Sequence, residues 1–382
     1  MNVTVICDVL GQANNGTTIA AMNLIDHLRA KGHKVTVVSP DVSTAGREGY
    51  MVVPTLNLTA PINRLVEKNN VQLAKADKKI LYEAIKDADV VHILIPFWLG
   101  CGAVKMARKL GKPITASFHC QAENFTAHIG MMGSKLVNRI TYKIFSRKVY
   151  RHCVKVHYPT EFIKNVFEKE AGRQFPSVVI SNGVDELFFE ERKKNPSGKF
   201  TIVCSGRYSK EKSQRDLLEA VGMSRHKDEI KIILAGQGPY EKRLKKRASK
   251  MGLDVEFRFF ERRELAQTLT DADLYVHTST VEIEAVSAME AIACGLVPVI
   301  CDSELSATRS FALDEANLFR KHSPRDLCKK IDFFFENPGK VAEYAARYGA
   351  KKNAFRLCEC MDRMESMLAD ACSHPEERRR AP

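Results

Sequence analysis

The feature that most constrains this chain is a regular alternation of short hydrophobic runs and longer amphipathic segments. The runs have the length and Val/Ile content of buried strands, and the segments between them have helical periodicity. Parallel strands need such crossover connections, so the alternation predicts a parallel sheet with helices on both faces. It restarts at 200–205 and continues through 230–235, which predicts an α/β chain with two doubly wound parallel sheets. In the first half the expected strands are 3–7, 34–39, 90–95 and 113–118, and the expected helices are 17–31, 78–86 and 101–110.

The 382 residues are enough for two domains, each with its own core. We expect the first domain at 1–186 and the second at 187–355, followed at 356–382 by a helix able to pack back on the first domain and a basic tail. No apolar stretch reaches the length of a membrane span, and a strand begins at once, so we expect no signal peptide. Eleven scattered cysteines without metal-ligand spacing favour reduced thiols and a cytoplasmic location.

The stretch 278–295 places two carboxylates, Glu282 and Glu290, eight positions apart around the start of a predicted helix. Strand-like runs at 274–277 and 296–300 flank it. Carboxylates accept hydrogen bonds from the hydroxyls of a polyhydroxylated ligand, and the N–H groups that open a helix can hold a phosphate. The stretch therefore predicts a site for a ligand with sugar, ribose and phosphate groups, which is a nucleotide sugar.

Other candidate residues follow predicted strands, where open α/β sheets bind ligands. Arg207 and Lys212 can converge on a diphosphate, Arg as a bidentate fork and Lys as a point charge, although lone surface charges are common. The loop that ends at Gly16 is either a tight turn or a phosphate contact. His119 ends the run 114–118, the place of a cleft residue, although a lone histidine is more often structural than catalytic.

Two Asp-x-Asp sequences, at 87–89 and 271–273, each precede a hydrophobic run. Such a pair can hold a divalent metal that bridges a diphosphate. We interpret both as turn residues leading into buried strands and predict no metal site.

Taken in order, these motifs resemble the large family of retaining GT-B glycosyltransferases with a Glu-x7-Glu motif. That family includes bacterial enzymes that glycosylate diacylglycerol or phosphatidylinositol, alongside sucrose- and capsule-related transferases. The resemblance implies two Rossmann-like domains facing a cleft, the first on the acceptor side and the second binding the donor. It also implies metal-independent, retaining transfer of a hexose from a nucleotide-diphosphate sugar, with UDP the expected carrier, to an acceptor hydroxyl, and no permanently bound cofactor. The matching segments run through nearly the whole chain: Gly16, His119, 181–185, 205–207 with Lys212, 235–239, and Glu282 to Glu290 with 293–295.

The resemblance also implies a role for each site residue of the second domain. Arg207 and Lys212 would neutralise the leaving diphosphate, and Gly236 would belong to the nucleotide-binding set. Glu290 would hold the ribose hydroxyls, and Glu282 would hold hydroxyls of the donor sugar.

Further implied contacts come from backbone groups and from the first domain. Backbone amides at Ala285 and Val286 would help to hold the donor, His119 would touch the sugar from the opposite domain, and Gly16 would let the backbone close on the phosphate. The chain departs from the family pattern at Ala285 and Phe259, where glycine is usual. Glu284 adds a third carboxylate, so the sugar contact is open between Glu282 and Glu284.

A basic stripe occupies a region with no acidic residue between 125 and 160, in a chain of formal net charge +13. Like charges at i, i+4 cost a helix about 0.2–0.5 kcal/mol per pair, so the stripe indicates an anionic partner. It predicts either a basic amphipathic helix lying on anionic lipid or a solvated helix face. The stripe consists of Lys135, Arg139, Lys143, Arg147 and Arg151, and the apolar residues expected on its other side are Leu136, Val137, Ile140, Ile144, Phe145 and Val149.

We therefore expect an enzyme peripheral to the inner face of the membrane, acting on a glycolipid or lipid precursor. The alternatives are an epimerase-like GT-B enzyme and a capsule or polysaccharide transferase with a soluble or lipid-linked glycan acceptor. A third alternative is a nucleic-acid-binding protein, in which Tyr142, Phe145 and Tyr150 would stack on bases between the basic residues. No recognised nucleic-acid motif is present, so we predict no nucleic-acid partner.

Overall fold

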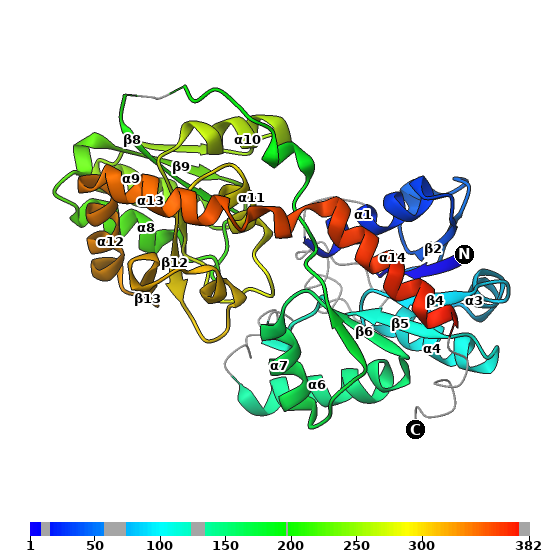
Figure 1. Cartoon of the computed structure of the whole chain (residues 1–382). Coiled ribbons are helices and arrows are strands. Elements are labelled where there is room, and N and C mark those ends of the chain that lie inside the picture. Colours follow the sequence, from blue (N-terminus) through cyan, green and yellow to red (C-terminus); the bar gives the residue numbers. More distant parts are fainter. Residues whose placement is uncertain (9–15, 57–73, 124–133, 196–197, 374–382) are drawn as a thin grey trace. The chain divides into compact units, whose positions relative to one another are not determined.

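The computed structural model describes residues 1–8, 16–56, 74–123, 134–195 and 198–373. The chain divides into two compact units, one formed by Met1–Asn182 with Cys360–Pro382 and the other by Gly183–Glu359. Each unit is a parallel sheet with helices packed on both faces, which confirms the predicted fold class (Figure 1).

The first unit contains a seven-stranded sheet in the order β3-β2-β1-β4-β5-β6-β7, with all neighbours parallel. Its order reverses between β1 and β4, and in open α/β sheets ligands bind beyond the carboxyl ends of the strands at such a point. The strands are β1 Asn2–Ile6, β2 Lys34–Ser39, β3 Tyr50–Val52, β4 Val90–Ile93, β5 Ile114–Ser117, β6 Lys155–Tyr158 and β7 Ser177–Val179.

Three helices of this unit, α3, α6 and α7, begin at polar caps. The side chains of Asp77, Ser134 and Thr160 each accept a hydrogen bond from a backbone N–H of the first turn that follows. The helices are α1 Gly16–Ala30, α3 Lys78–Ile85, α4 Trp98–Lys109, α6 Lys135–Lys148 and α7 Glu161–Ala171, with short 3₁₀ turns η1 Val42–Thr44 and η2 Tyr150–His152.

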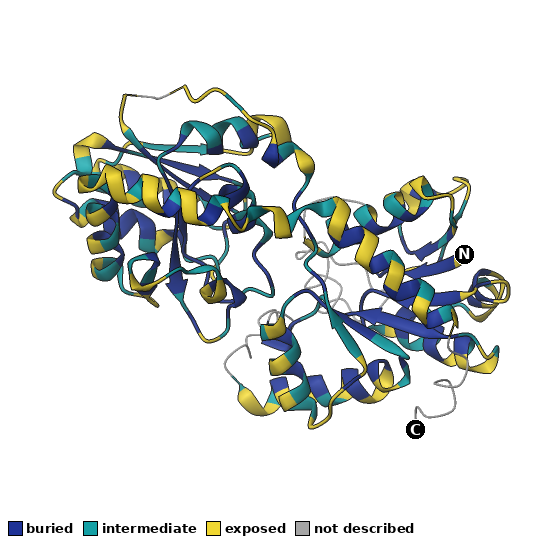
Figure 2. Cartoon of the chain, viewed as in Figure 1, coloured by how far each residue is buried: buried dark blue, intermediate teal, exposed yellow. Residues whose placement is uncertain are grey.

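The second unit contains a six-stranded parallel sheet in the order β10-β9-β8-β11-β12-β13. Neighbouring residues of β8 belong to different core clusters, Ile202 to one and Val203 to the other, because the sheet is covered on both faces. The central strands of this sheet are therefore almost wholly buried, whereas its two edge strands are partly exposed (Figure 2). They are β8 Phe200–Ser205, β9 Ile230–Ala235, β10 Val255–Arg258, β11 Leu274–His277, β12 Pro298–Asp302 and β13 Leu318–Arg320.

The last helix of the chain belongs mostly to the first unit. Helix α14, Leu357–Ser373, starts in the second unit and contributes Cys360 onwards to the first. No helix among the described residues is both long and apolar enough to cross a membrane. The remaining helices are α8 Gln214–Met223, α9 Glu241–Met251, α10 Arg262–Asp271, α11 Val286–Ala293, α12 Pro324–Glu336 and α13 Pro338–Gly349, with 3₁₀ turns η3 Glu186–Phe189, η4 Lys227–Glu229, η5 Ala307–Phe311, η6 Glu315–Asn317 and η7 Lys352–Phe355.

The two Asp-x-Asp sequences lie at the amino ends of the sheets. Asp89 accepts a hydrogen bond from the backbone N–H of Asn2 at 2.7 Å, and Asp273 accepts one from Thr201 at 2.8 Å. Each carboxylate thus secures the start of the first strand of its unit. These positions are opposite the carboxyl ends, where parallel sheets bind ligands.

Candidate active site

Two loops of the second unit, after β8 and β9, approach each other so closely that glycine is required. A Cβ at Gly236 would lie 2.1 Å from the carbonyl oxygen of Gly206, and a Cβ at Gly238 would lie 2.6 Å from that of Tyr208. Gly206 also has a φ of +138°, a conformation that side chains rarely adopt. The packed loops fix the backbone on both sides of Arg207, whose side chain is exposed at the carboxyl end of β8.

A charged cluster lies beside these loops. The Lys212 Nζ donates a hydrogen bond to Glu282 Oε1, and the Nε2 of His277, the last residue of β11, lies 3.3 Å from the same oxygen. The backbone holds both charged residues in place: Thr278 donates to the carbonyl of Lys212 at 2.6 Å, and the N–H of Glu282 donates to that of Leu305 at 3.2 Å. Two predicted residues that are 70 positions apart in sequence are therefore in direct contact.

The cluster keeps its charges despite its burial. Burial alone would raise the pKa of Glu282, but the charge of Lys212 and the neighbouring His277 ring hold that pKa well below its usual range. Burial likewise acts to lower the pKa of Lys212, and the charge of Glu282 raises it above its ordinary value. Burial lowers the pKa of His277, so its ring is neutral near pH 7. The site contains an ammonium–carboxylate pair next to a neutral imidazole.

Helix α11 begins next to this cluster with a strained residue. Ala285, its N-cap, has φ 62° and ψ 62°, the left-handed conformation that glycine adopts without cost. This explains why a glycine is usual at the position. The N–H groups of Val286 and Ser287 come before the first hydrogen-bonded N–H of the helix, that of Ala288, which donates to the carbonyl of Ala285 at 2.9 Å. Such a helix start is a favourable place for phosphate oxygens.

Glu290 lies one turn further along α11 and is partly buried. Burial raises the pKa of Glu290 to about 7, opposed by the positive charge of Arg262 and reinforced by Asp185. The two glutamates of the stretch therefore differ: Glu282 is ionised and paired, whereas Glu290 exchanges its proton near neutral pH. Glu284 is buried, with 4% of its surface exposed, and Lys212 pairs with Glu282 rather than with Glu284.

The site residues predicted in the first unit lie at the carboxyl ends of its strands. His119 follows β5, and its ring centroid is 5.9 Å from that of the buried His157. Burial lowers the pKa of His119 well below its usual value, so it is a neutral imidazole. Gly16 is the first residue of α1, and the loop before it lies outside the described residues.

Sequence reasoning missed two candidate residues. His277 ends β11 directly before the two-glutamate stretch, the same kind of position that drew attention to His119, so the signal was available. Asp8 follows β1 and is fully buried, and burial raises its pKa to about 7 in spite of nearby backbone N–H groups of Ala74, Leu99 and Gly100. In the sequence Asp8 looks like any other aspartate before a loop, and only its burial in the structure distinguishes it.

Comparison with known proteins gives the class. Residues 14–186 match the family described as Glycosyltransferase Family 4, and residues 185–352 match Glycosyl transferases group 1. These matches run through both units, and the chain belongs to the GT-B glycosyltransferases.

Individual relatives are distant in sequence but nearly complete in coverage. The chain is 24% identical over 311 residues to a GDP-mannose-dependent alpha-mannosyltransferase of Mycolicibacterium smegmatis, covering 78% of this chain and 79% of that protein. It is 23% identical over 383 residues to the alpha-monoglucosyldiacylglycerol synthase of Acholeplasma laidlawii, covering 91% and 93%. The solved structure of Anabaena HepE in complex with UDP matches 97% of this chain and all of that one, with a TM-score of 0.73 at 16% identity, which shows a shared fold.

Proposed function

We propose that this glycosyltransferase moves a hexose, with retention of anomeric configuration, from a UDP-linked donor to a hydroxyl of a membrane lipid or glycolipid. The observation that carries the proposal is the contact of Lys212 with Glu282. This pair lies beside the start of α11, the helix that contains Glu290. A nucleotide sugar needs a cation for its diphosphate and carboxylate acceptors for its two sets of sugar hydroxyls. All three groups belong to the second unit.

Lys212 has three N–H donors, so it can keep Glu282 while it binds an oxygen of the diphosphate. Glu282 then accepts a hydrogen bond from a donor-sugar hydroxyl, and Glu290 accepts from the ribose. Arg207, exposed at the same strand end, adds a second positive charge, and we assign the backbone amides of Ala285 and Val286 to the same donor site. No metal is required, because these cations and N–H dipoles neutralise the leaving group.

The reaction breaks the bond between the anomeric carbon and the diphosphate oxygen, whose electron pair leaves with the nucleotide. The acceptor oxygen bonds to the same face of the sugar, and its proton passes to the departing diphosphate. The transition state has oxocarbenium character, as in glycoside hydrolysis. His119 cannot serve as a cationic acid at neutral pH because its pKa is too low, so its proposed role is a contact with the sugar.

The acceptor class rests on the relatives. Two of them, by their names, are a mannosyltransferase that depends on GDP-mannose and a synthase of a glucosyl lipid. A lipid acceptor also agrees with the basic stripe on α6 and would place the enzyme at the inner face of the membrane. GDP-mannose is the competing donor.

The test is a thermal-shift panel of UDP, GDP and their hexose conjugates, followed by turnover of the best donor with lipid extracts. Binding to the folded protein raises its apparent stability, so the panel ranks the donors. We expect Glu290→Ala to abolish the shift and the turnover, whereas Glu343→Ala, an exposed glutamate of α13, changes neither. NMR of the product determines the anomeric configuration. Full activity of Glu290→Ala, or no turnover of any nucleotide sugar, would refute the proposal, and nucleotide release without an acceptor would favour the epimerase-like alternative.

A further inference from the structure

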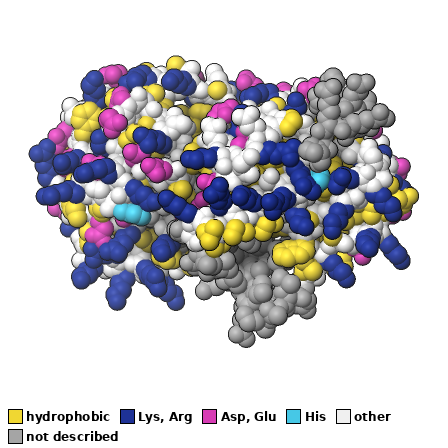
Figure 3. Space-filling view, turned by 90° about the horizontal axis from the view of Figure 1, so that it is seen from below, with side chains coloured by type: hydrophobic (Ala, Val, Ile, Leu, Met, Phe, Trp, Pro, Cys, Tyr) yellow, Lys and Arg dark blue, Asp and Glu magenta, His cyan; other side chains and the backbone are white. Residues whose placement is uncertain are grey.

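Helix α6 exposes a row of large apolar side chains next to its basic residues. Leu136, Ile140 and Ile144 are 69%, 49% and 50% exposed, although the sequence pattern assigned them to the side away from the basic stripe. They recur every four residues and extend about 12 Å along the helix. Figure 3 shows the same arrangement, a row of Lys and Arg side chains bordered by a row of hydrophobic ones, on the side where α6 lies.

The reason is that α6 packs through an inner face that is partly polar. That face contains Asn138 and Thr141 besides Tyr142 and Phe145, and all four are buried. Leu136, Ile140 and Ile144 are therefore largely exposed to solvent instead of packing in the core. Exposed apolar rows of this kind mark interaction sites, because water solvates them poorly.

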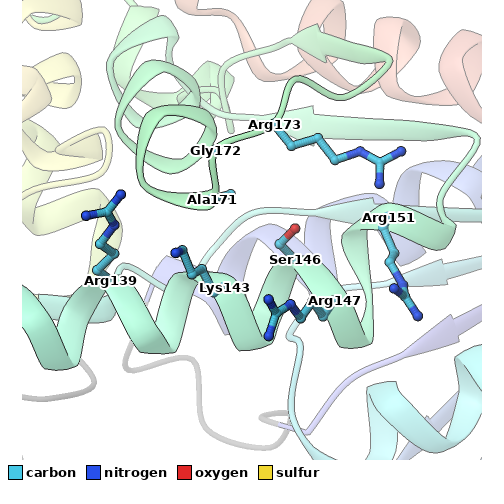
Figure 4. A pocket seen from close by; sticks show the side chains of 8 residues that line it. All are labelled: Arg139, Lys143, Ser146, Arg147, Arg151, Ala171, Gly172 and Arg173. Carbon is cyan, nitrogen blue, oxygen red and sulfur yellow. The ribbon is translucent and has the colours of Figure 1, made fainter.

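A pocket of about 420 Å³ lies on the basic side of α6. Figure 4 shows Arg139, Lys143 and Arg147 projecting from successive turns of α6, with Arg173 from beyond the end of α7 on the opposite wall. The full lining is Arg139, Lys143, Ser146, Arg147, Arg151, Ala171, Gly172 and Arg173.

The cations of this pocket have no carboxylate partner among the described residues. The salt bridge recorded on the neighbouring helix α7 joins Lys164 to Glu161, and none includes a residue of the pocket. Arg173 instead lies over the ring of Phe175, 5.9 Å from its centroid. Five positive side chains around one pocket repel each other, so an anion of more than one charge stabilises them together.

We propose that the pocket binds the phosphate of an anionic phospholipid while Leu136, Ile140 and Ile144 enter the membrane interface. We call these residues together with the pocket the α6 docking surface. A basic surface attracts the anionic leaflet, and an adjacent apolar row anchors it among the acyl chains. This inference rests on the proposed function only in naming its membrane partner, and the test below requires no glycosyl transfer.

A nucleic acid fits the surface less well. The aromatic residues proposed to stack on bases are buried: Tyr142, Phe145 and Tyr150 are 0%, 5% and 1% exposed. The burial of these rings therefore speaks against the nucleic-acid alternative. A polyphosphate backbone would also leave the apolar row exposed to water.

The experiment is flotation of the purified full chain with vesicles of phosphatidylcholine alone or with 30% phosphatidylglycerol. We expect binding only to the anionic vesicles. Removing the charges in Arg139→Gln/Lys143→Gln/Arg147→Gln should weaken binding on the order of 100-fold, at about fivefold per charge. The matched control is Lys242→Gln/Lys246→Gln/Lys250→Gln, an equally spaced exposed triplet on α9, which should bind nearly as the parent does.

Two further pairs separate the pocket and the apolar row from general surface charge. Arg173→Gln should weaken binding about fivefold, and Lys169→Gln, an exposed charge in the last turn of α7 and outside the pocket, should change it less than twofold. Ile140→Gln/Ile144→Gln should lower vesicle binding without changing net charge, whereas Met223→Gln, 58% exposed in the second unit, should not. Circular dichroism confirms that each variant is folded.

The inference is overturned if the α9 triplet weakens binding as much as the α6 triplet, or if neutral vesicles bind equally well. It is also overturned if a duplex or single-stranded oligonucleotide binds through the same residues and vesicles do not. Vesicle binding without any nucleotide-sugar turnover would leave this inference standing and refute the proposed function.

Discussion

At the scale of single residues, Lys212 and Glu282 form a largely buried ion pair. The two side chains are 22% and 13% exposed, so both charges have lost much of their hydration. A pair of this kind is retained at a cost, because well-packed apolar residues would often be at least as stable. The arrangement is reasonable where the cation and the carboxylate are each needed for a charged and hydroxylated ligand.

Removing one partner of this pair should therefore be more harmful than removing both. We expect Lys212→Met to lower the free energy of unfolding by about 3 kcal/mol, because Glu282 is left buried without a counter-charge. The double variant Lys212→Met/Glu282→Gln should be more stable than Lys212→Met alone. Urea unfolding measures the cycle, and Lys340→Met, which breaks an exposed pair with Glu343, should cost less than about 0.5 kcal/mol.

The same pair has a defined pH dependence. The pKa of Glu282 in the folded state lies below its ordinary value of 4.5, so the stability it contributes is complete above that pH and is lost as the pH falls through the folded-state pKa. If Lys212→Met and Lys212→Met/Glu282→Gln had equal free energies of unfolding both above and below pH 4.5, the assignment of the pair would be contradicted.

Ala285 carries backbone strain that a single substitution can release. A left-handed conformation costs a residue with a Cβ about 1–2 kcal/mol relative to glycine. We expect Ala285→Gly to raise the free energy of unfolding by about 1 kcal/mol, less what glycine adds to the entropy of the unfolded chain. Ala291→Gly, in the interior of α11, should lower it by about 1 kcal/mol. A loss of stability in Ala285→Gly would mean that the strain is balanced by packing.

At this scale the sequence predicted residue types better than their environments. Glu282 and Lys212 were both chosen from their places after strands, and they are in contact. The sequence could not indicate that His277 and Lys212 lie near the same oxygen of Glu282, or that Asp8 is buried. Both facts depend on side chains from distant segments. The departure at Ala285 was visible in sequence, but its meaning required the dihedral angle.

At the scale of elements, the hydrophobic strands and their crossover helices followed from periodicity alone. The strand expected at 34–39 is β2, Lys34–Ser39, and the helix expected at 101–110 begins three residues earlier, at Trp98. The helix of the basic stripe was also expected, but its inner face was not. Asn138 and Thr141 are buried there, and hydropathy patterns assign polar residues to the outside.

Strands β4, β5 and β6 share a buried chain of hydrogen bonds that fixes the proton positions. The carbonyl of Ile180 can only accept, so His157 Nε2 donates to it at 2.7 Å, and His157 Nδ1 accepts from Ser117 at 2.8 Å. Ser117 then accepts from His92 Nε2 at 2.9 Å. Burial lowers the pKa of His92 to about 3 and that of His157 to about 4, so both rings are neutral in the folded protein.

The two buried histidines of this hydrogen-bond chain, His92 and His157, should make the first unit sensitive to acid. Histidines of the unfolded chain take up protons below pH 6.5 while these two do not, so stability falls by about 1.4 kcal/mol per pH unit for each of them between pH 6.5 and about 4. We expect His92→Gln to flatten the pH dependence of the melting temperature, at a cost in stability at pH 7. His322→Gln, an exposed histidine, should leave the slope unchanged. An unchanged slope in His92→Gln would show that other groups govern the acid response.

At the scale of the whole molecule, the return of α14 to the first unit ties the end of the chain to its beginning. His33 Nε2 lies 2.8 Å from Glu365, and Lys31 pairs with Asp362 at 2.8 Å. The restart of the alternation at 200–205 indicated the second sheet, which begins at β8. The sequence predicted only a helix able to pack back and none of its contacts, because His33 and Glu365 are 332 positions apart.

Most of the stabilisation by α14 should come from its apolar face rather than from these ion pairs. Burying each large side chain contributes about 1.5–3 kcal/mol, so four of them together contribute at least about 6 kcal/mol, which is comparable to the net stability of a domain. The side chains concerned are Met361, Met364, Met367 and Leu368.

Truncation after Glu359 should therefore leave the first unit unfolded or aggregated, whereas truncation after Ser373 should keep the melting temperature and solubility of the full chain. Glu365→Gln, which weakens the contacts with His27 and His33, should have a much smaller effect, because partly exposed ion pairs contribute little. Calorimetry and gel filtration distinguish these outcomes. If the shorter chain melted like the full one, α14 would be an appendage of the first unit, and its buried face would have to be packed in another way.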